Sequence, residues 1–252
     1  MERLKNYIGI YFNLPGKERL KFHSHILSPV LHFLYPHICI GCGSDIIEDN
    51  NFLCLDCIEN LPHTGFAMHA NNPVEKIFRG RLPLASGTSE FYFSKDSLIQ
   101  NVIHEFKYKG NLKLGKYLGR IMGSSLAASD RFSQIDLVIP LPLFSKKELK
   151  RGYNQAKILC EGIAEVLKVP LEVQSVIRIY NTETQTKKGR IERWENVEKS
   201  FSVLAPEMLE GKNILLVDDV VTTGATLEAC AAQILKTKNV TLSIATLAFA
   251  TH

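Results

Sequence analysis

The second half of the chain alternates between two patterns of apolar residues. Segments at 135–141, 171–180, 213–217 and 240–250 have the composition of buried strands. Between them lie two sets of apolar residues at helical spacing: Ala156, Leu159, Cys160, Ile163 and Leu167, and then Leu227, Cys230, Ala231, Ile234 and Leu235. Strands that alternate with helices predict an α/β fold with a mostly parallel sheet covered by helices. Ligands of such sheets bind beyond the carboxyl ends of the strands.

The first half of the chain carries weaker signals. Residues 84–93 have strand composition, and apolar positions within 98–106 and 114–126 predict two helices. A polar stretch at 69–73, which contains asparagine and proline, is typical of a linker. Residues 181–200 form a second polar stretch, which is too long for an ordinary connection in a compact domain.

Cysteine spacing indicates a metal site. Four of the six cysteines lie within 19 residues in the pattern C-x2-C-x11-C-x2-C: Cys39, Cys42, Cys54 and Cys57. Two such pairs can direct four thiolates at one tetrahedral Zn²⁺, and a site closed by four thiolates is structural rather than catalytic. Two disulfides are the alternative, but they need an oxidising compartment, and the N-terminus shows no export signal. Cys160 and Cys230 lie on apolar helix faces, where we expect small buried side chains.

These patterns divide the chain into three predicted parts. Residues 1–35 mix apolar and basic side chains, with a short helix expected at 26–35. A four-cysteine zinc ribbon is predicted at 36–64, and the α/β domain at 75–252.

The composition excludes several classes of protein. Of 252 residues, 45% are hydrophobic and 22% are charged, which is typical of a globular protein rather than a disordered one. No apolar run approaches the roughly 20 residues that a membrane helix needs. The formal net charge of +4 is far below that of a domain that coats nucleic acid. We therefore expect a cytoplasmic protein with no membrane span.

The most informative segment begins where the predicted strand at 213–217 ends. Asp218 and Asp219 follow the strand, and two carboxylates there can bind a vicinal diol or a metal ion. A loop of small residues then leads into the next helix: Thr222, Thr223, Gly224, Ala225 and Thr226. The N–H groups and the dipole of a helix N-terminus suit a phosphate. An acidic turn followed by an ordinary helix cap is the alternative interpretation.

This segment resembles the phosphoribosyl-diphosphate (PRPP) signature of type I phosphoribosyltransferases. The resemblance implies that Asp218 and Asp219 hold the ribose hydroxyls and face Mg²⁺, and that residues 222–226 bind the 5′-phosphate. In 6-oxopurine salvage enzymes an aspartate opens this loop, whereas this chain has Thr222. The resemblance therefore argues against hypoxanthine or guanine as the acceptor.

Further motifs occur in register along most of the chain. They are Tyr35-Pro36 with the four cysteines, Phe106-Lys-Tyr-Lys-Gly110, Pro140-Leu-Pro142, Arg151-Gly-Tyr-Asn-Gln155, Gln185-Thr186, Arg190 and Asn196-Val197. With the PRPP signature, this set resembles the competence protein F family of bacteria from about residue 30 onwards. The resemblance implies a zinc ribbon joined to a phosphoribosyltransferase-like domain, a role in DNA uptake during natural transformation, and partners such as a helicase of that machinery.

Two basic segments take roles from the same resemblance. After the strand at 135–141, Arg151, Asn154 and Gln155 match the family motif where the fold holds pyrophosphate, so we expect them to bind PRPP. In the stretch at 181–200, Gln185 and Arg190 match a mobile loop that closes over the reacting centre, so we expect them to be catalytic. A solvated basic helix start and a disordered surface loop are the alternatives.

Aromatic and basic residues alternate near the end of the helix predicted at 98–106. Tyr108 can stack on a base while Lys107, Lys109 and Lys113 meet phosphates, as in proteins that bind single-stranded DNA. A helix end with Phe106 in the core and the lysines in water explains the same spacing. The sequence thus supports two functions: PRPP-dependent transfer to an unidentified acceptor, or a module that binds DNA or a partner without turnover.

Overall fold

The computed structural model describes residues 38–45, 47, 51–95, 97–144, 148–149, 152–179 and 200–250. The helix expected at 26–35 lies outside the described residues, as do Arg151, Gln185 and Arg190. Residues Cys39–His252 form one compact unit.

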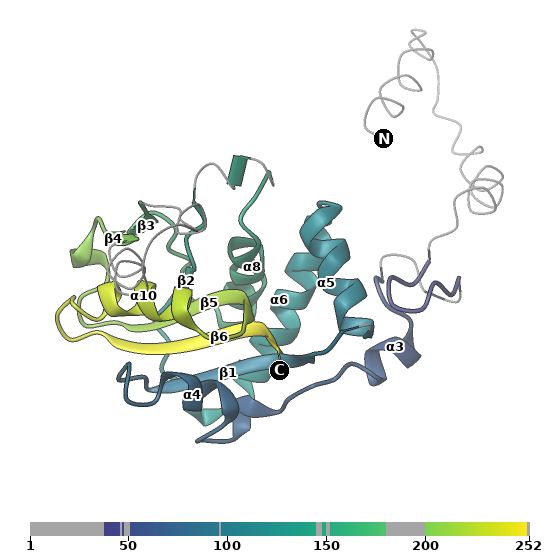
Figure 1. The fold of residues 1–252 in the computed structure, drawn as a ribbon, viewed down its shortest axis with the longest axis horizontal. Coiled ribbons are helices and arrows are strands. Elements are labelled where there is room, and N and C mark those ends of the chain that lie inside the picture. The colour runs from purple at the N-terminus through teal and green to yellow at the C-terminus, as the bar shows by residue number, and fades with distance from the viewer. Residues whose placement is uncertain are drawn as a thin grey trace, which may run out of the picture. The chain divides into compact units, whose positions relative to one another are not determined.

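A four-stranded parallel sheet forms the centre of this unit, in the order β1-β6-β5-β2 (Figure 1). Its strands are β1 (Ser86–Phe93), β2 (Leu137–Pro140), β5 (Asn213–Val221) and β6 (Thr241–Ala250). The predicted α/β fold class with a mostly parallel sheet is confirmed.

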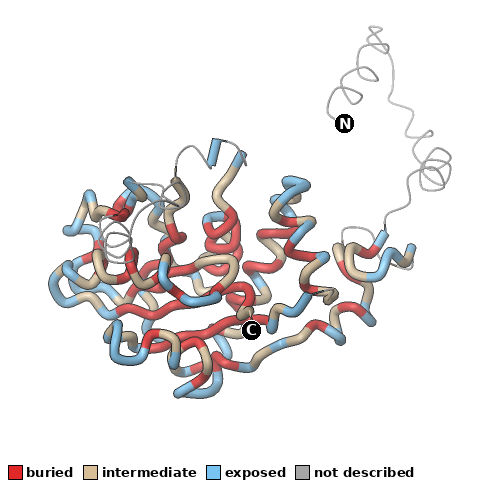
Figure 2. Tube along the Cα trace, viewed as in Figure 1, coloured by how far each residue is buried: buried red, intermediate tan, exposed pale blue. Residues whose placement is uncertain are grey.

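Alternate strand residues face two separate hydrophobic layers. In β5, Leu215 and Val217 pack into one layer, whereas Ile214 and Leu216 pack into the other. The first layer contains α5 (Leu98–Tyr108), α6 (Leu112–Ala127) and α8 (Gln155–Leu167), and the second contains α4 (Pro73–Phe78) and α10 (Ala225–Ile234). Figure 2 shows buried residues along the strands and the helix faces that cover them. None of the described helices combines the length and the apolar character needed to span a membrane.

The helices α6 and α8 pack with their backbones in close approach. A Cβ atom added at Gly119 would clash with the backbone carbonyl of Leu159, and one at Gly162 would clash with the carbonyl of Lys116. The two glycines therefore set the distance between the helices.

The two cysteines outside the cluster are buried, as predicted. Cys160 of α8 is fully buried. Cys230 of α10 is also fully buried, in the opposite layer.

The prediction of one strand at 171–180 is wrong in extent and position. Within the described residues 171–179, Val176–Arg178 alone forms a strand, β3, which pairs antiparallel with β4 (Phe201–Val203) in a separate two-stranded sheet. Before it, Glu172 Oε1 accepts hydrogen bonds from the amides of Gln174 and Ser175, at 2.6 and 2.9 Å. This local turn competes with strand pairing, because it uses amides that a strand would offer to its neighbour.

The predicted linker at 69–73 is instead part of the packed structure. Asn72 is 5% exposed and caps α4, because its Oδ1 accepts hydrogen bonds from the amides of Val74 and Glu75, at 3.0 and 3.2 Å. Its Nδ2 donates to three backbone carbonyls, those of Gly87 (2.7 Å), His69 (2.9 Å) and Phe66 (3.2 Å). The polar side chain of Asn72 therefore serves buried hydrogen bonds, whereas His69 and Asn71 are exposed.

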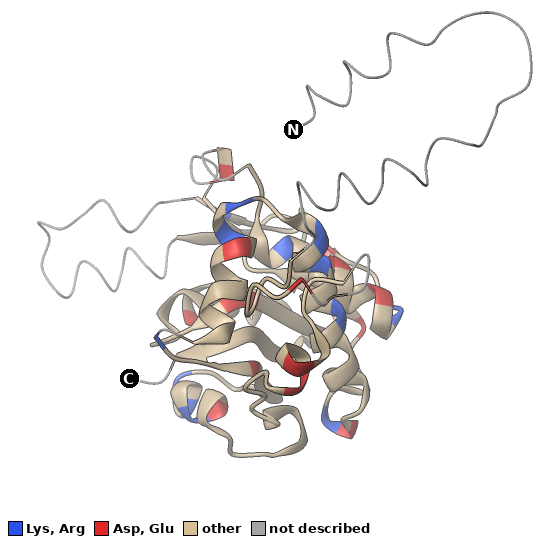
Figure 3. Ribbon diagram, turned by 90° about the vertical axis from the view of Figure 1, so that its right-hand side faces the viewer, with Lys and Arg blue, Asp and Glu red and all other residues tan. Residues whose placement is uncertain are grey.

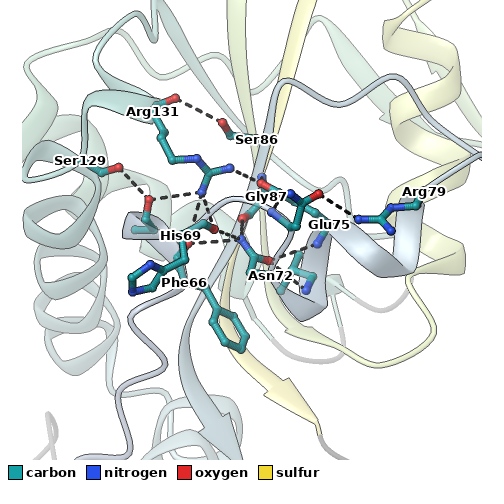
Figure 4. A network of polar contacts seen from close by, with 12 residues as sticks. Phe66, His69, Asn72, Glu75, Arg79, Ser86, Gly87, Ser129 and Arg131 are labelled. Atoms are coloured by element: carbon teal, nitrogen blue, oxygen red, sulfur yellow. Dashed lines mark hydrogen bonds and ion pairs between the residues drawn. The ribbon is translucent and has the colours of Figure 1, made fainter.

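A second set of contacts holds the same stretch from the other side (Figure 4). Arg131 forms an ion pair with Glu75 and donates to the carbonyl of His69 at 2.9 Å. Glu75 also accepts a hydrogen bond from the amide of Gly87 in β1, at 3.1 Å. The network fixes α4 against the sheet.

The segment after the four cysteines covers the free edge of β1. His63 forms an antiparallel bridge with Phe91, the amide of Tyr92 donates to the carbonyl of Pro62 at 2.8 Å, and the amide of Thr64 donates to the carbonyl of Glu90 at 2.9 Å. The imidazole of His63 lies 2.7 Å from Glu90 Oε1, so it is engaged away from the cysteines.

Candidate functional site

The four clustered cysteines have the geometry of a tetrahedral metal site. Their Sγ atoms all lie within 4.8 Å of one another, and those of Cys42 and Cys54 are 3.8 Å apart. A tetrahedron with metal–sulfur bonds of about 2.3 Å has sulfur–sulfur edges of about 3.8 Å. The six cysteines are all free thiols, which argues against the alternative of two disulfides. The donor set fits a structural metal ion.

Local backbone geometry favours the thiolate form of one member of the cluster, Cys39. The amide of Cys54, which precedes the short helix α3 (Leu55–Glu59), donates to Cys39 Sγ at 3.3 Å. Burial opposes ionisation of Cys39, but hydrogen bonds from the amides of Cys42, Cys54 and Gly41 outweigh it and lower the pKa of Cys39 to about 6.

The cysteine cluster shares its core with the α/β domain. Cys39 and Cys57 belong to the same hydrophobic cluster as Ile99 and Val102 of α5. At Gly41, an added Cβ would lie 2.8 Å from Cys57 Sγ and 2.9 Å from Leu98. The cluster therefore packs directly against α5.

The acidic pair lies within β5 rather than after it, because this strand continues to Val221. Successive strand residues face opposite sides of a sheet. Asp218 lines a hollow formed with residues 220–227. Asp219 instead forms an ion pair with Lys107 of α5, with 2.6 Å between Oδ2 and Nζ. One of the four predicted DNA-contacting residues is thus at the acidic pair.

The environment of Asp218 favours its neutral form. Burial, and after it the negative charge of Asp219, raise the pKa of Asp218 to about 8. A hydrogen bond from the amide of Asp219 and the charges of Lys107 and Arg178 act in the opposite direction. Arg178 lies in β3 with its guanidinium 5.3 Å from the ring centre of Phe201. Sequence patterns did not indicate Arg178, which lies on β3, outside the four-stranded sheet.

The hollow beside Asp218 ends at the N-terminus of α10. Gly224 precedes this helix with a φ of 74°, in the left-handed region, and as a glycine at the N-cap it offers no side chain to the first amides of the helix. A Cβ at Gly224 would also lie 2.7 Å from both Ile77 and Phe78 of α4. Thr222, Thr223 and Ala225 are exposed, and Thr226 is partly exposed. Unpaired amides, hydroxyl groups and the positive end of the helix dipole suit an anion.

Arg81, which sequence reasoning missed, holds this loop in place. Its guanidinium donates to the carbonyl of Thr223 at 3.2 Å and forms an ion pair with Glu228 at 2.7 Å. It also donates to the carbonyl of Ile77 at 2.8 Å, which ties the loop to α4. The contact depends on the position of α4, which has no strong sequence signal.

Two of the predicted PRPP contacts have a role within the protein. Asn154 caps α8 by accepting from the amide of Ala156 at 3.0 Å, and its Nδ2 donates to the carbonyl of Leu141 at 3.1 Å. Gln155 is buried at the start of α8. The hydroxyl of Tyr153, between Arg151 and Asn154, donates to the carbonyl of Phe106 in α5. These contacts join the loop before α8 to the helix that carries Lys107.

The other predicted DNA contacts remain at the surface of α5 and α6. Tyr108 is 68% exposed, with its ring 4.9 Å from that of His104. Lys109 is exposed and pairs with Glu105 at 2.8 Å, and Lys113 is exposed. In the view of Figure 3, basic residues are interspersed with acidic ones. This part of the surface is mixed in charge, and Tyr108 is an accessible aromatic residue on it.

The described residues form an α/β fold with a parallel sheet, joined to a four-cysteine cluster that fits a zinc ribbon. The family model described as phosphoribosyl transferase domain matches residues 151–252 of this chain. The chain is a homologue of the competence protein F, ComFC and YhgH proteins.

Three of these relatives are similar over most of the chain. Competence protein F of Haemophilus influenzae is 28% identical over 75% of this chain and 86% of its own length. Competence protein ComFC of Bacillus subtilis is 28% identical over 79% of this chain and 78% of its own. DNA utilization protein YhgH of Escherichia coli K12 is 27% identical over 79% of this chain and 84% of its own.

Among solved structures, glutamine PRPP amidotransferase of Bacillus subtilis is similar over 56% of this chain and 30% of that chain. The TM-score is 0.39 and the identity is 18%.

Proposed function

We propose that this protein binds PRPP together with Mg²⁺ on its phosphoribosyltransferase-type domain and acts in DNA uptake. The observation that carries the proposal is the hollow in which a carboxyl group, Asp218, faces the uncapped N-terminus of α10. A sugar diol needs hydrogen-bond acceptors and a phosphate needs amide donors, and this hollow offers both. The role in DNA uptake is inferred from the names of the homologues, competence protein F and DNA utilization protein YhgH.

Each part of the site has a separate task in this proposal. The amides and hydroxyl groups of residues 222–226 bind the 5′-phosphate, and Asp218 and Asp219 accept hydrogen bonds from the ribose hydroxyls. Bound Mg²⁺ would be held by the same two carboxylates, and it supplies charge neutralisation for the pyrophosphate leaving group. Arg151, Asn154 and Gln155 would contact the pyrophosphate, and Arg151 would contribute positive charge. Gln185 and Arg190 would close over the site and exclude water.

We also infer that Cys39, Cys42, Cys54 and Cys57 hold a structural Zn²⁺. The fit of the 3.8 Å sulfur–sulfur distance to a tetrahedron supports this inference. A site closed by four thiolates leaves no position for a substrate, so the metal would stabilise the fold and prepare a surface for a partner such as a helicase. Such a partner, and a cytoplasmic location, remain predictions of the sequence.

Calorimetry of PRPP binding tests the proposal. We expect saturable binding of PRPP with Mg²⁺ to the wild type, and at least a tenfold loss of affinity in the double variant Asp218→Asn/Asp219→Asn. Asp130→Asn is the matched control, because it removes an exposed carboxylate from the short helix η2 (Asp130–Phe132). No binding to folded, zinc-loaded wild type would refute the proposal. Release of pyrophosphate on addition of an acceptor would separate a transferase from a binding module.

Binding of single-stranded DNA is a second candidate function, favoured by the exposed ring of Tyr108 beside Lys109 and Lys113. Stacking of one base on an aromatic ring contributes about 1–3 kcal/mol. Tyr108→Ala should therefore weaken binding of an oligothymidylate at least fivefold in fluorescence anisotropy, whereas Met68→Ala, which removes another exposed apolar side chain, should not. Equal affinity of Tyr108→Ala and wild type would exclude this surface.

A further inference from the structure

Lys107 occupies an unusual position for a residue in the last turn of a surface helix. Its ammonium group lies 2.6 Å from Asp219 Oδ2, and the two side chains are only 19% and 16% exposed. In contrast, Lys109 is two residues away, is 63% exposed and pairs with Glu105 of its own helix. The two lysines of one short motif therefore have different surroundings, and only Lys107 reaches the acidic pair.

The backbone at Lys107 is fixed, while its side chain can move. The preceding residue, Phe106, is fully buried, and its carbonyl accepts a hydrogen bond from the hydroxyl of Tyr153. The lysine side chain reaches Asp219 through a flexible four-carbon stem, so the ammonium can change partners without a movement of α5. Tyr153 belongs to the loop before α8, in which the pyrophosphate side of the proposed site lies.

The ion pair competes with any ligand of Asp219. A divalent cation that binds this carboxylate must displace the ammonium, because two cations cannot share one partly buried carboxylate without strong repulsion. The displaced ammonium would be partly buried without a counter-ion, which is costly. It therefore needs a new anionic partner, and the phosphate groups of a ligand in the same site provide one.

We propose that Lys107 is the resident counter-ion of Asp219, that a divalent cation displaces it when the site is filled, and that it then contacts the anionic groups of the ligand. This inference rests on the proposed function and deepens it, because it assigns Lys107 to the proposed PRPP site rather than to a DNA surface. It predicts that Lys107 has opposite effects on the affinity for a metal ion alone and on the affinity for PRPP with Mg²⁺. Removing its charge should favour binding of the metal ion alone and weaken binding of PRPP.

Manganese and PRPP, measured separately, test the inference. Binding of Mn²⁺ alone is followed by electron paramagnetic resonance, and binding of PRPP with Mg²⁺ by calorimetry, on full-length zinc-loaded protein. For Lys107→Met we expect about tenfold tighter Mn²⁺ binding and about tenfold weaker PRPP binding, the size expected for one partly buried charged contact. Lys107→Arg, which keeps the charge, should stay within threefold of wild type in both measurements. Lys109→Met is the control and should change neither.

Several outcomes would overturn the inference. One is unchanged or undetectable Mn²⁺ binding in Lys107→Met. Another is an equal effect of Lys109→Met, which would show a general effect of nearby positive charge instead of the ion pair between Lys107 and Asp219. If wild type binds no PRPP, the proposed function and the phosphate contact both fail, but the manganese measurement still decides whether Lys107 shields Asp219. A circular dichroism unfolding curve of each variant confirms that it is folded, and Lys107→Gln, which also removes the charge, provides the second test if Lys107→Met is not.

Discussion

Asn72 gives the sharpest test of how the fold is held together. Asn72→Ala removes a helix cap, which costs about 1 kcal/mol. It also leaves the carbonyl of Gly87 without its 2.7 Å hydrogen bond at a buried position, and an unsatisfied buried group costs about 1–3 kcal/mol. The carbonyl of His69 keeps a hydrogen bond from Arg131, so the loss of its hydrogen bond from Asn72 adds little to the destabilisation. We expect a decrease of about 3 kcal/mol in the free energy of unfolding.

Urea denaturation followed by far-UV circular dichroism measures this change. A change of about 1 kcal/mol shifts the melting temperature of a domain of this size by about 2–4 °C. The melting temperature of Asn72→Ala should therefore be about 6–12 °C below that of wild type. Asn72→Ser keeps a capping hydroxyl but loses the three donated hydrogen bonds, so its loss of stability should fall between those of wild type and Asn72→Ala. His69→Ala is the control, because the network uses only the carbonyl of this residue. A loss below 1 kcal/mol in Asn72→Ala, or one equal to that of His69→Ala, would refute the reasoning.

Four further predictions concern other parts of the structure. Gly119→Ala should lower the free energy of unfolding by at least about 2 kcal/mol in urea denaturation, because α6 and α8 must separate to admit the methyl group; a neutral result would contradict the close approach. Gly224→Ala should weaken PRPP binding at least tenfold in calorimetry, since it strains a left-handed residue and meets Ile77 and Phe78. Cys57→Ser, or removal of zinc by a chelator, should increase hydrogen exchange in α5 as well as in the cysteine cluster, because both share one core. A hydrogen bond from the amide of Asn213 lowers the pKa of Asp136. The carboxylate therefore stabilises the folded state at pH 7, and this stabilisation is lost as the pH falls through the lowered pKa. The difference in the free energy of unfolding between wild type and Asp136→Asn should shrink in acid.

The features that sequence predicted correctly are local in the chain. The strand at 213–217, the acidic pair and the loop before α10 follow one another directly, so their proximity needs no knowledge of the fold. The four cysteines are also close in sequence, and the structure brings their sulfur atoms within 4.8 Å of one another, as a tetrahedral site requires. The parallel sheet followed from the alternation of strand and helix, which is a regular property of the chain.

The features that sequence missed depend on contacts between distant residues. Arg81 reaches Thr223, 142 residues away, and does so only because α4 packs against the loop. The extension of β5 through Asp218 and Asp219 depends on pairing with β6, where Asp218 lies opposite Thr246. Charged residues normally indicate the end of a buried strand, so this pattern predicted that the strand would end at Val217. The sequence analysis predicted a DNA contact for Lys107, as for the other lysines of its motif. Helical spacing cannot show which of these lysines lies next to an acidic side chain of another element.

The covered edge of β1 has a consequence for how the protein behaves in solution. An exposed edge strand offers unpaired amide and carbonyl groups to other molecules, and it is a common starting point for aggregation. Here Pro62, His63 and Thr64 occupy that edge directly after the cysteine cluster. A fragment that begins at residue 75 would keep the whole parallel sheet but lose this cover. The segment that leaves the cysteine cluster therefore protects the protein against edge-to-edge self-association.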